Sequence, residues 1–330
     1  MDDGLQRVQA GTRGIRRRVA GRGFSYVSAN GRKIVSEPLL ARINSLAIPP
    51  AWDQVWIASS PNAHIQATGI DAAGRLQYIY HPRWREVREH EKFIRSLAFA
   101  QRLPTVRRII TRDLKQEADG RTRALAAAVR LMDRAGLRVG GAAYAQENGS
   151  FGATTLRKRH LELEADRIHL QFRGKSDGHW DVEFIDGLLA DYFAALPRTP
   201  RSAPAICHAI VSGRRKQWHA VTDSEVNAYL GTVAGQGFTA KDFRTWQGTV
   251  VAALSLGRSL RAGATSPEAV TAAVGEAAQW LHNTPAIARA SYVNPRVIEL
   301  FERGVVADGQ RQPDSAVLAL LLDGASQEST

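Results

Sequence analysis

The spacing of apolar residues changes near Glu89, and this change limits the folds open to the chain. Before it, between Phe24 and Tyr80, short β-prone runs alternate with turn signals such as Asn30-Gly31 and the tetrapeptide DAAG. After it, apolar residues recur at helical spacing, for example in EHEKFIRSLAFAQRL and RTRALAAAVRLMDRAG. Strands gathered in one part of a chain and helices in the other predict an α+β fold.

Three segments follow from this division. Residues 1–20 are polar and basic, and we expect them to form a flexible arm. Residues 21–88 are expected to form a small β-rich N-terminal domain. Residues 89–330 are expected to form a larger, mainly helical domain, and a chain of 330 residues is long enough for both.

One β-type segment interrupts the helical part. Ile168 and Phe172 alternate with polar residues before a turn-rich centre, and Val182 and Phe184 do so after it. This period-two pattern around a turn predicts a β-hairpin. Lys175 is expected at or near its tip.

The charge balance points to the class of partner. Basic side chains outnumber acidic ones, 44 to 32, which gives a net charge of +12. The excess favours nucleic acid as a partner, with general solubility as the alternative explanation. No apolar run reaches the ~20 residues that cross a membrane, and no signal peptide is recognisable. With a single cysteine, Cys207, expected in the core, we expect a cytoplasmic, nucleoid-associated protein without a membrane partner.

Several common catalytic motifs are absent from the sequence. It contains no P-loop, no Cys/His spacing typical of a metal site and no carboxylate cluster suited to two Mg²⁺ ions. Chemistry at a phosphodiester is therefore expected without a metal or another cofactor. Such chemistry needs a nucleophile, cationic donors for the non-bridging oxygens, and an acid for the leaving oxygen.

The chain offers a candidate for each of these tasks. Arg138 lies among glycines, and Arg244 lies near the start of an expected helix. Lys175 lies on the expected hairpin, and Tyr292 follows NTPAIARAS in a basic segment. Taken singly, each has an ordinary structural explanation, such as a solvated surface arginine or a half-buried tyrosine.

Taken together and in this order, these residues lie in stretches that resemble the type IB DNA topoisomerases. The resemblance is to the short bacterial form related to the poxvirus enzyme, and it covers about residues 24 to 300. The stretches are IPPAWDQVWIASSPNAHIQATGIDAAGRLQYIYHPRWREVRE, RVGGAAYAQENGSFGATTLRKRH, FRGKSDGHW, TAKDFRTWQGTVVAA and NTPAIARASYVNP. The resemblance implies a monomer whose two domains clamp around double-stranded DNA. It also implies relaxation of supercoils by cleavage and religation of one strand, without ATP or metal.

The resemblance also implies roles for individual residues. Tyr292 falls at the position of the nucleophile that forms a 3′-phosphotyrosyl bond. Arg138 and Arg244 fall at the two catalytic arginines, and Lys175 falls at the hairpin lysine that protonates the leaving 5′ oxygen.

Five further residues are expected to contact DNA. Lys241 matches a basic position near the scissile phosphate, and Tyr144 matches a position that contacts the DNA backbone. Gln77 and Tyr78 match a pair that faces the major groove, which makes residues 21–88 a DNA-binding domain. Arg289 is expected to contribute by its charge, three residues before the nucleophile.

The fifth catalytic position departs from the poxvirus pattern. Asn283 stands where that form has histidine, and His282 directly precedes it. An asparagine amide can donate a hydrogen bond to a phosphate oxygen, but it carries neither a proton for transfer nor a charge. We expect Asn283 to take part in catalysis and His282 to face elsewhere.

Two other functions share parts of this pattern. A tyrosine recombinase uses the same nucleophile chemistry, but it expects histidine three residues before its second arginine, where this chain has Lys241. The β-rich N-terminal domain also argues against a recombinase. A DNA-binding protein with an inactive site would be expected to lack Tyr292 or an arginine, and this chain retains them.

Overall fold

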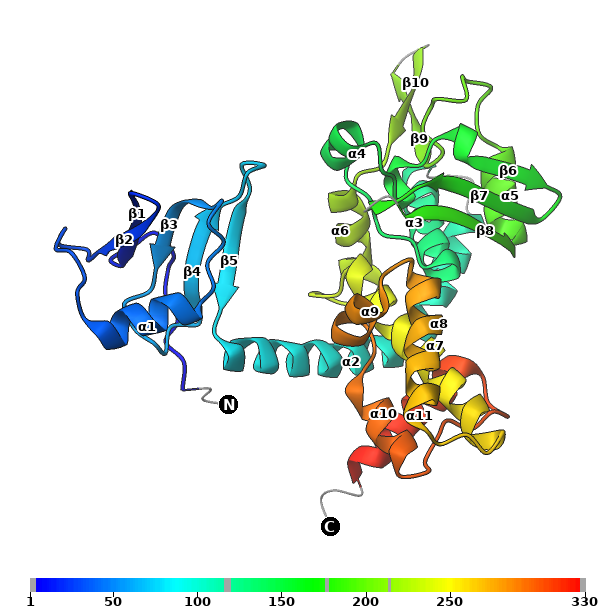
Figure 1. Ribbon diagram of the computed structural model, residues 1–330. Helices are drawn as coiled ribbons and strands as arrows, with labels where there is room; N and C mark the ends of the chain where they lie inside the picture. Colours follow the sequence, from blue (N-terminus) through cyan, green and yellow to red (C-terminus); the bar gives the residue numbers. More distant parts are fainter. Residues whose placement is uncertain (1–3, 116–119, 176–177, 213–214, 327–330) are drawn as a thin grey trace. The chain divides into compact units, whose positions relative to one another are not determined.

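The computed structural model describes residues 4–115, 120–175, 178–212 and 215–326 (Figure 1). The chain divides into two compact units, Met1–Lys92 and Phe93–Thr330. Strands dominate the first unit and helices the second. The fold is therefore α+β, as the sequence predicts.

The first unit is built on an antiparallel five-stranded sheet in the order β2-β1-β3-β4-β5. Helix α1 (Glu37–Ser45) packs on it, and Ile43 of this helix joins Val55 and Ile57 in a small core. The DAAG turn connects β4 to β5, as predicted. The strands are β1 (Ile15–Ala20), β2 (Gly23–Val27), β3 (Asp53–Ile57), β4 (Ile65–Ile70) and β5 (Leu76–Tyr80).

One prediction for this unit needs correction. The flexible arm is wrong for Ile15–Ala20, because this segment is β1 and pairs with both β2 and β3. Ile15 is buried, and the Arg17 guanidinium lies over the Phe24 ring and donates to the Pro49 carbonyl oxygen. Arg17 is thus used in packing.

The turn predicted at Asn30-Gly31 is confirmed. The Ser28 N–H donates to the Arg32 carbonyl oxygen, and Val27 pairs in an antiparallel bridge with Lys33. The longer hairpin of this region, β1 with β2, turns between Ala20 and Gly23.

The second unit surrounds the long helix α7 (Ala240–Arg261), which is buried along most of its length. Its first residues follow a reciprocal cap between Thr239 and Asp242. The other helices are α2 (Pro82–Lys115), which begins in the first unit, α3 (Gly120–Ala135), α4 (Ala142–Asn148), α5 (Gly187–Ala194), α6 (Asp223–Val233), α8 (Pro267–Leu281), α9 (Pro285–Ser291), α10 (Pro295–Glu302) and α11 (Pro313–Ser326). No helix in the described part of the chain has the length and apolar character to span a bilayer.

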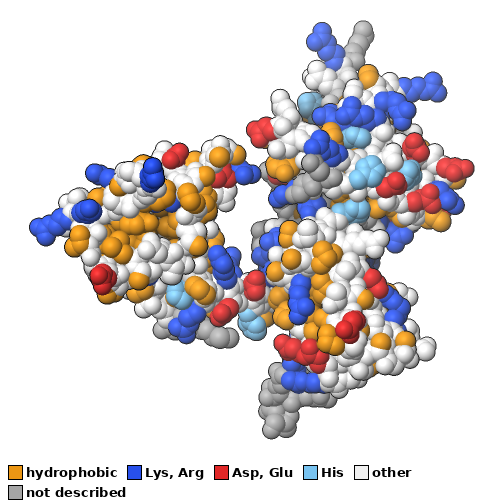
Figure 2. Space-filling model, in the orientation of Figure 1, with side chains coloured by type: hydrophobic (Ala, Val, Ile, Leu, Met, Phe, Trp, Pro, Cys, Tyr) orange, Lys and Arg blue, Asp and Glu red, His pale blue; other side chains and the backbone are white. Residues whose placement is uncertain are grey.

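Two separate β elements belong to this unit. The predicted hairpin consists of β7 (Arg167–Arg173) and β8 (His179–Ile185), and β6 (Leu161–Glu164) adds a third strand. The ribbon of β9 (Cys207–Ser212) and β10 (Arg215–Ala220) was not predicted from the sequence. Cys207 is buried as expected, but Val211 in the same apolar run is 67% exposed. Figure 2 shows Lys and Arg side chains gathered around this ribbon.

Candidate active site

Tyr292 occupies the turn between α9 and α10, where neighbouring groups fix its backbone. Its N–H donates to the Ala288 carbonyl oxygen at 3.0 Å. The Thr249 hydroxyl of α7 donates to the Tyr292 carbonyl oxygen at 2.9 Å and accepts from the Asn294 N–H at 3.0 Å. Thr284 caps α9 by accepting from the Ile287 N–H, as its position before Pro285 predicts. The half-buried phenol is thereby held on a short, anchored segment.

Arg244 lies in the first turns of α7 and is only 3% exposed. Its two terminal nitrogens donate to carbonyl oxygens on opposite sides, Nη1 to Gly136 and Nη2 to Leu281, the latter at 2.8 Å. The guanidinium carbon lies 5.3 Å from the centre of the Tyr292 ring. The remaining nitrogen, Nε, is buried and has no hydrogen-bond partner.

Arg138 and Asn283 form the second part of the site. Arg138 Nη2 donates to Asn283 Oδ1 at 2.5 Å, although the two residues are 145 positions apart in the chain. A guanidinium can only donate, so the amide oxygen of Asn283 must face it and the amide nitrogen must point away. That nitrogen, Nδ2, is buried and unpaired. The site thus holds two buried donors without a hydrogen-bond acceptor, Arg244 Nε and Asn283 Nδ2.

The surrounding charges distinguish Tyr292 from other buried tyrosines. Burial raises the pKa of the Tyr292 phenol. The positive charge of Arg244, hydrogen bonding from its guanidinium, and the charges of Arg138 and Lys241 outweigh burial and bring the pKa below its ordinary value. Burial raises the pKa of Tyr192 and of Tyr229 above that value. Among these three, Tyr292 is the phenol suited to become a nucleophile.

The pKa values of the two arginines near Tyr292, Arg138 and Arg244, are lowered as well. Burial first, and the charge of Arg138 second, lower the pKa of Arg244 to about 10. Burial likewise lowers the pKa of Arg138. Two partly desolvated cations held close together favour an anion between or beside them.

Lys175 lies two residues after the end of β7 and is exposed, and residues 176–177 of the hairpin tip lie outside the described residues. Together with Arg138 and Tyr144 it lines a cavity of about 260 Å³. Lys241 is exposed in the first turn of α7, three residues before Arg244. The structure therefore brings Arg138, Arg244, Asn283 and Tyr292 together, and it places Lys175 on a cavity wall shared with Arg138.

Comparison with known proteins identifies the class of site. The family described as "Eukaryotic DNA topoisomerase I, catalytic core" matches residues 81–299. The family described as "Bacterial DNA topoisomerase IB, N-terminal domain" matches residues 23–71. The chain belongs to the type IB DNA topoisomerases. It is similar to "DNA topoisomerase 1B" of Acanthamoeba polyphaga mimivirus, with 29% identity over 294 residues that cover 88% of each chain.

Other residues predicted to contact DNA lie outside this cluster. Gln77 and Tyr78 belong to β5 of the first unit. The Gln77 amide nitrogen donates to Asp71 Oδ2 at 2.8 Å, whereas Tyr78 is 41% exposed and stacks on Tyr80. Arg289 is exposed in the last turn of α9, three residues before Tyr292. Their contacts with DNA stay predictions.

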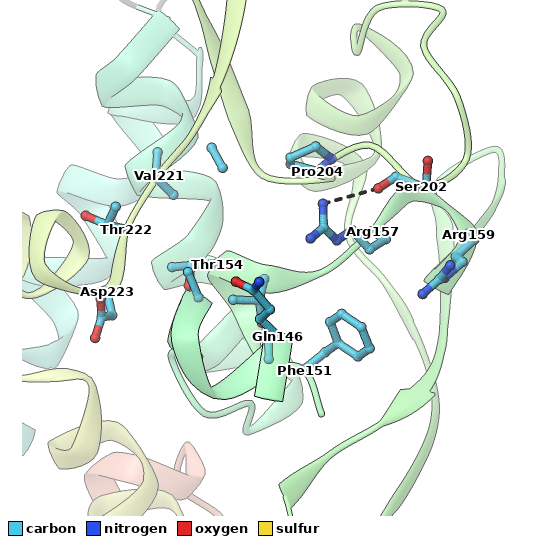
Figure 3. A pocket seen from close by; sticks show the side chains of 14 residues that line it. Gln146, Phe151, Thr154, Arg157, Arg159, Ser202, Pro204, Val221, Thr222 and Asp223 are labelled. Carbon is cyan, nitrogen blue, oxygen red and sulfur yellow. Dashed lines mark hydrogen bonds between the residues drawn. The ribbon is translucent and has the colours of Figure 1, made fainter. Parts of the chain in front are cut away.

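A larger cavity of about 640 Å³ lies in the same unit of the topoisomerase (Figure 3). Gln146, Phe151, Arg157 and Asp223 are among the residues that line it. It shares Phe151 and Asp223 with the smaller cavity, but none of the predicted catalytic side chains lines it. Size therefore does not identify the reactive site in this protein.

Two residues that support Tyr292 were not predicted from the sequence. Thr249 binds the Tyr292 carbonyl oxygen, and Gly248 lets α7 approach the same segment. A Cβ atom on Gly248 would lie 2.9 Å from Leu281 Cδ1 and 3.0 Å from Tyr292 Cβ. An isolated glycine inside a strongly helical apolar segment is a sequence signal for such close packing.

Gly248→Ala is therefore expected to slow formation of the covalent complex with DNA. The added methyl group must displace Tyr292 or Leu281, and a shift of about 1 Å in a reacting group can reduce a rate by about 100-fold. Single-turnover cleavage of a labelled duplex measures the effect. Gly257→Ala is the matched control in α7, because its new Cβ would meet the flexible end of Arg261 at 3.3 Å and the Ala307 carbonyl oxygen at an ordinary contact distance of 3.7 Å. Equal cleavage rates in both variants would contradict the packing role of Gly248.

Proposed function

We propose that this topoisomerase relaxes supercoiled double-stranded DNA through a covalent tyrosine intermediate. The Tyr292 phenol releases its proton to solvent, and the phenolate oxygen attacks the scissile phosphorus, so that a 3′-phosphotyrosyl bond forms as the bond to the 5′ oxygen breaks. The 5′ oxygen takes a proton and leaves as a hydroxyl, and its strand rotates about the intact one. The 5′ hydroxyl then attacks the phosphotyrosine, which restores the DNA strand and the free phenol.

The observation that carries this proposal is a pair of unpaired donors, one on Arg244, whose guanidinium lies over the Tyr292 ring, and one on Asn283, which binds Arg138. Arg244 Nε and Asn283 Nδ2 are both buried without an acceptor, and leaving such a group unpaired costs about 1–3 kcal/mol. Non-bridging oxygens of a phosphodiester attacked by Tyr292 would accept from both. The donors would then bind most strongly where negative charge develops in the transition state.

The remaining groups divide the work by their chemistry. Arg138 and Arg244 neutralise charge on the non-bridging oxygens, because their guanidinium forks match phosphate geometry. The same two cations favour the Tyr292 phenolate. Asn283 contributes a neutral donor in place of the histidine of the poxvirus form. Lys175 serves as the acid for the 5′ oxygen, because a lysine can release its proton and an arginine cannot.

The phosphotyrosyl bond conserves the energy of the phosphodiester that it replaces, so religation needs no ATP. Each protein group in the scheme acts through a proton, a charge or a hydrogen bond. The test is relaxation of a negatively supercoiled plasmid in EDTA, without ATP and without added metal. We expect complete relaxation, with a covalent adduct trapped on the 3′ side of the break. An absolute need for Mg²⁺ or ATP, or an adduct on the 5′ side, would contradict the proposal.

Replacement of Lys175 tests the acid. Lys175→Ala is expected to slow cleavage by about 10² to 10⁴, the usual contribution of a general acid. In a substrate with sulfur in place of the 5′ bridging oxygen, the 5′ end leaves as a thiolate and needs no proton. This substrate is expected to restore most of the cleavage rate of Lys175→Ala. Lys216→Ala, which changes an exposed lysine on β10, is the control and should cleave the ordinary substrate normally. Absence of rescue by sulfur would remove Lys175 from the acid role.

A further inference from the structure

His282 has an unusual backbone conformation for its residue type. It ends α8 with φ 47° and ψ 55°, in the left-handed region that glycine adopts most easily. Its imidazole ring stacks on the indole of Trp180, with ring centres 3.8 Å apart and planes inclined by 22°. The side chain therefore has a specific contact at a position where a side chain is conformationally unfavourable.

Trp180 belongs to the hairpin that carries Lys175. On β8 it is paired across the strands with Phe172 of β7, and their rings stack at 5.6 Å. Both side chains are buried. Gly174, the residue directly before Lys175, lies against the indole, because a Cβ atom there would be only 2.4 Å from Trp180 Nε1. The indole thus supports the backbone from which Lys175 extends.

His282, the other partner of the stack, is next to Asn283 in the chain. His282 directly precedes it, and the Asn283 N–H donates to the Ala278 carbonyl oxygen at 2.9 Å, which closes the end of α8. The Asn283 side chain then accepts from Arg138. Trp180 is therefore in contact with the residue before Lys175 and with the residue before Asn283.

We propose that His282 is a positioning residue, and that its stack on Trp180 holds the Lys175 hairpin in register with the Asn283–Arg138 pair. The inference rests on the proposed function, in which both groups serve one phosphate. Lys175 must reach the 5′ bridging oxygen while Asn283 and Arg138 bind its non-bridging oxygens. The distance between the hairpin and the end of α8 therefore has to be fixed, and the stack is a contact that joins the two directly.

The electrostatic state of His282 suits this role. Burial, together with the nearby charges of Arg244, Arg138 and His179, lowers the pKa of the imidazole below its ordinary value, although a hydrogen bond to the His179 backbone on β8 acts in the opposite direction. A neutral ring stacks on indole without adding a further cation to the site. It also leaves the phosphate to the two arginines and Asn283.

Two replacements separate the stack from the backbone requirement. His282→Gly removes the ring and suits the left-handed backbone, so loss of activity would not come from strain. His282→Phe keeps a flat ring that can stack on Trp180. Single-turnover cleavage is measured for each on the ordinary duplex and on the duplex with a 5′ bridging sulfur. Thermal unfolding of each variant verifies that it is folded.

We expect His282→Gly to cleave the ordinary duplex about 10- to 100-fold more slowly, because the acid is displaced. His282→Phe should remain within about threefold of the wild-type rate if ring stacking is what matters. The sulfur substrate should restore His282→Gly to near the wild-type rate, since no acid is then needed. A wild-type rate for His282→Gly, or an equal loss on both substrates, would overturn the positioning role.

The same measurements separate this inference from the proposed function. Wild-type protein that forms no covalent adduct with either duplex would contradict the tyrosine mechanism itself. Lys175→Ala that is not rescued by sulfur would contradict the acid assignment and the stack's role in presenting that acid. Rescue of Lys175→Ala without rescue of His282→Gly would leave the mechanism intact and reject the inference alone.

Discussion

Tyr292→Phe is expected to abolish relaxation of supercoiled plasmid while leaving DNA binding unchanged. Phenylalanine keeps the ring that packs beneath the Arg244 guanidinium, so the anchored segment between α9 and α10 should hold its place. The substitution removes only the oxygen that attacks phosphorus. Loss of a nucleophile from a covalent mechanism reduces turnover by at least about 10⁴-fold. Gel assays of relaxation, adduct trapping and duplex binding measure the three quantities on one preparation.

Tyr229→Phe is the matched control for this experiment. The Tyr229 hydroxyl donates to Asp113 Oδ2 at 2.7 Å, and burial together with this carboxylate raises its pKa. Its removal should lower stability and leave the relaxation rate of the folded protein unchanged. Residual relaxation by Tyr292→Phe at more than a trace level would show that another group is the nucleophile. Equal loss in both variants would point to a defect in folding instead.

Local signals in the sequence account for several parts of the fold, because the interactions that form these parts join residues close together in the chain. The capping box of α6 joins Thr222 and Glu225, three residues apart, and both of its hydrogen bonds form. The β7–β8 hairpin follows from alternation around one turn, with Phe172 and Trp180 in direct register. The strands that were not predicted from the sequence have no such local signal. Half of Ile15–Ala20 is arginine, and β10 is exposed along its whole length, so neither shows the pattern of a half-buried strand.

The sequence suggests the residues of the candidate active site but not their geometry. Motifs identified Arg138, Arg244 and Tyr292, whereas contacts between distant segments decide how they act. Arg244 donates to the Gly136 and Leu281 carbonyl oxygens, which lie in separate parts of the chain. His282 was expected to face elsewhere, and its stack on Trp180 explains why it does. Such contacts depend on tertiary packing, which spacing along one sequence does not encode.

Arg244→Ala is expected to produce the second largest loss of activity. The cation that favours the Tyr292 phenolate disappears, and so does a donor to the non-bridging oxygens. Loss of one such preorganised donor lowers a rate by about 10² to 10³. The protein should also be less stable, because the Gly136 and Leu281 carbonyl oxygens lose their partner at about 1–3 kcal/mol each.

Two further variants separate the catalytic loss from the structural one. Arg244→Lys keeps a charge near Tyr292, but its ammonium cannot replace the planar fork, so we expect cleavage to stay at least about tenfold slow. Arg130→Ala removes an arginine whose Nε lies 2.7 Å from Oδ2 of the buried Asp186. Neither residue is among the predicted catalytic residues. The replacement should lower the unfolding temperature and leave the cleavage rate of folded protein intact. If Arg130→Ala and Arg244→Ala lost cleavage to the same extent, Arg244 would be a structural residue, and its unpaired Nε would not be the phosphate donor that the mechanism requires.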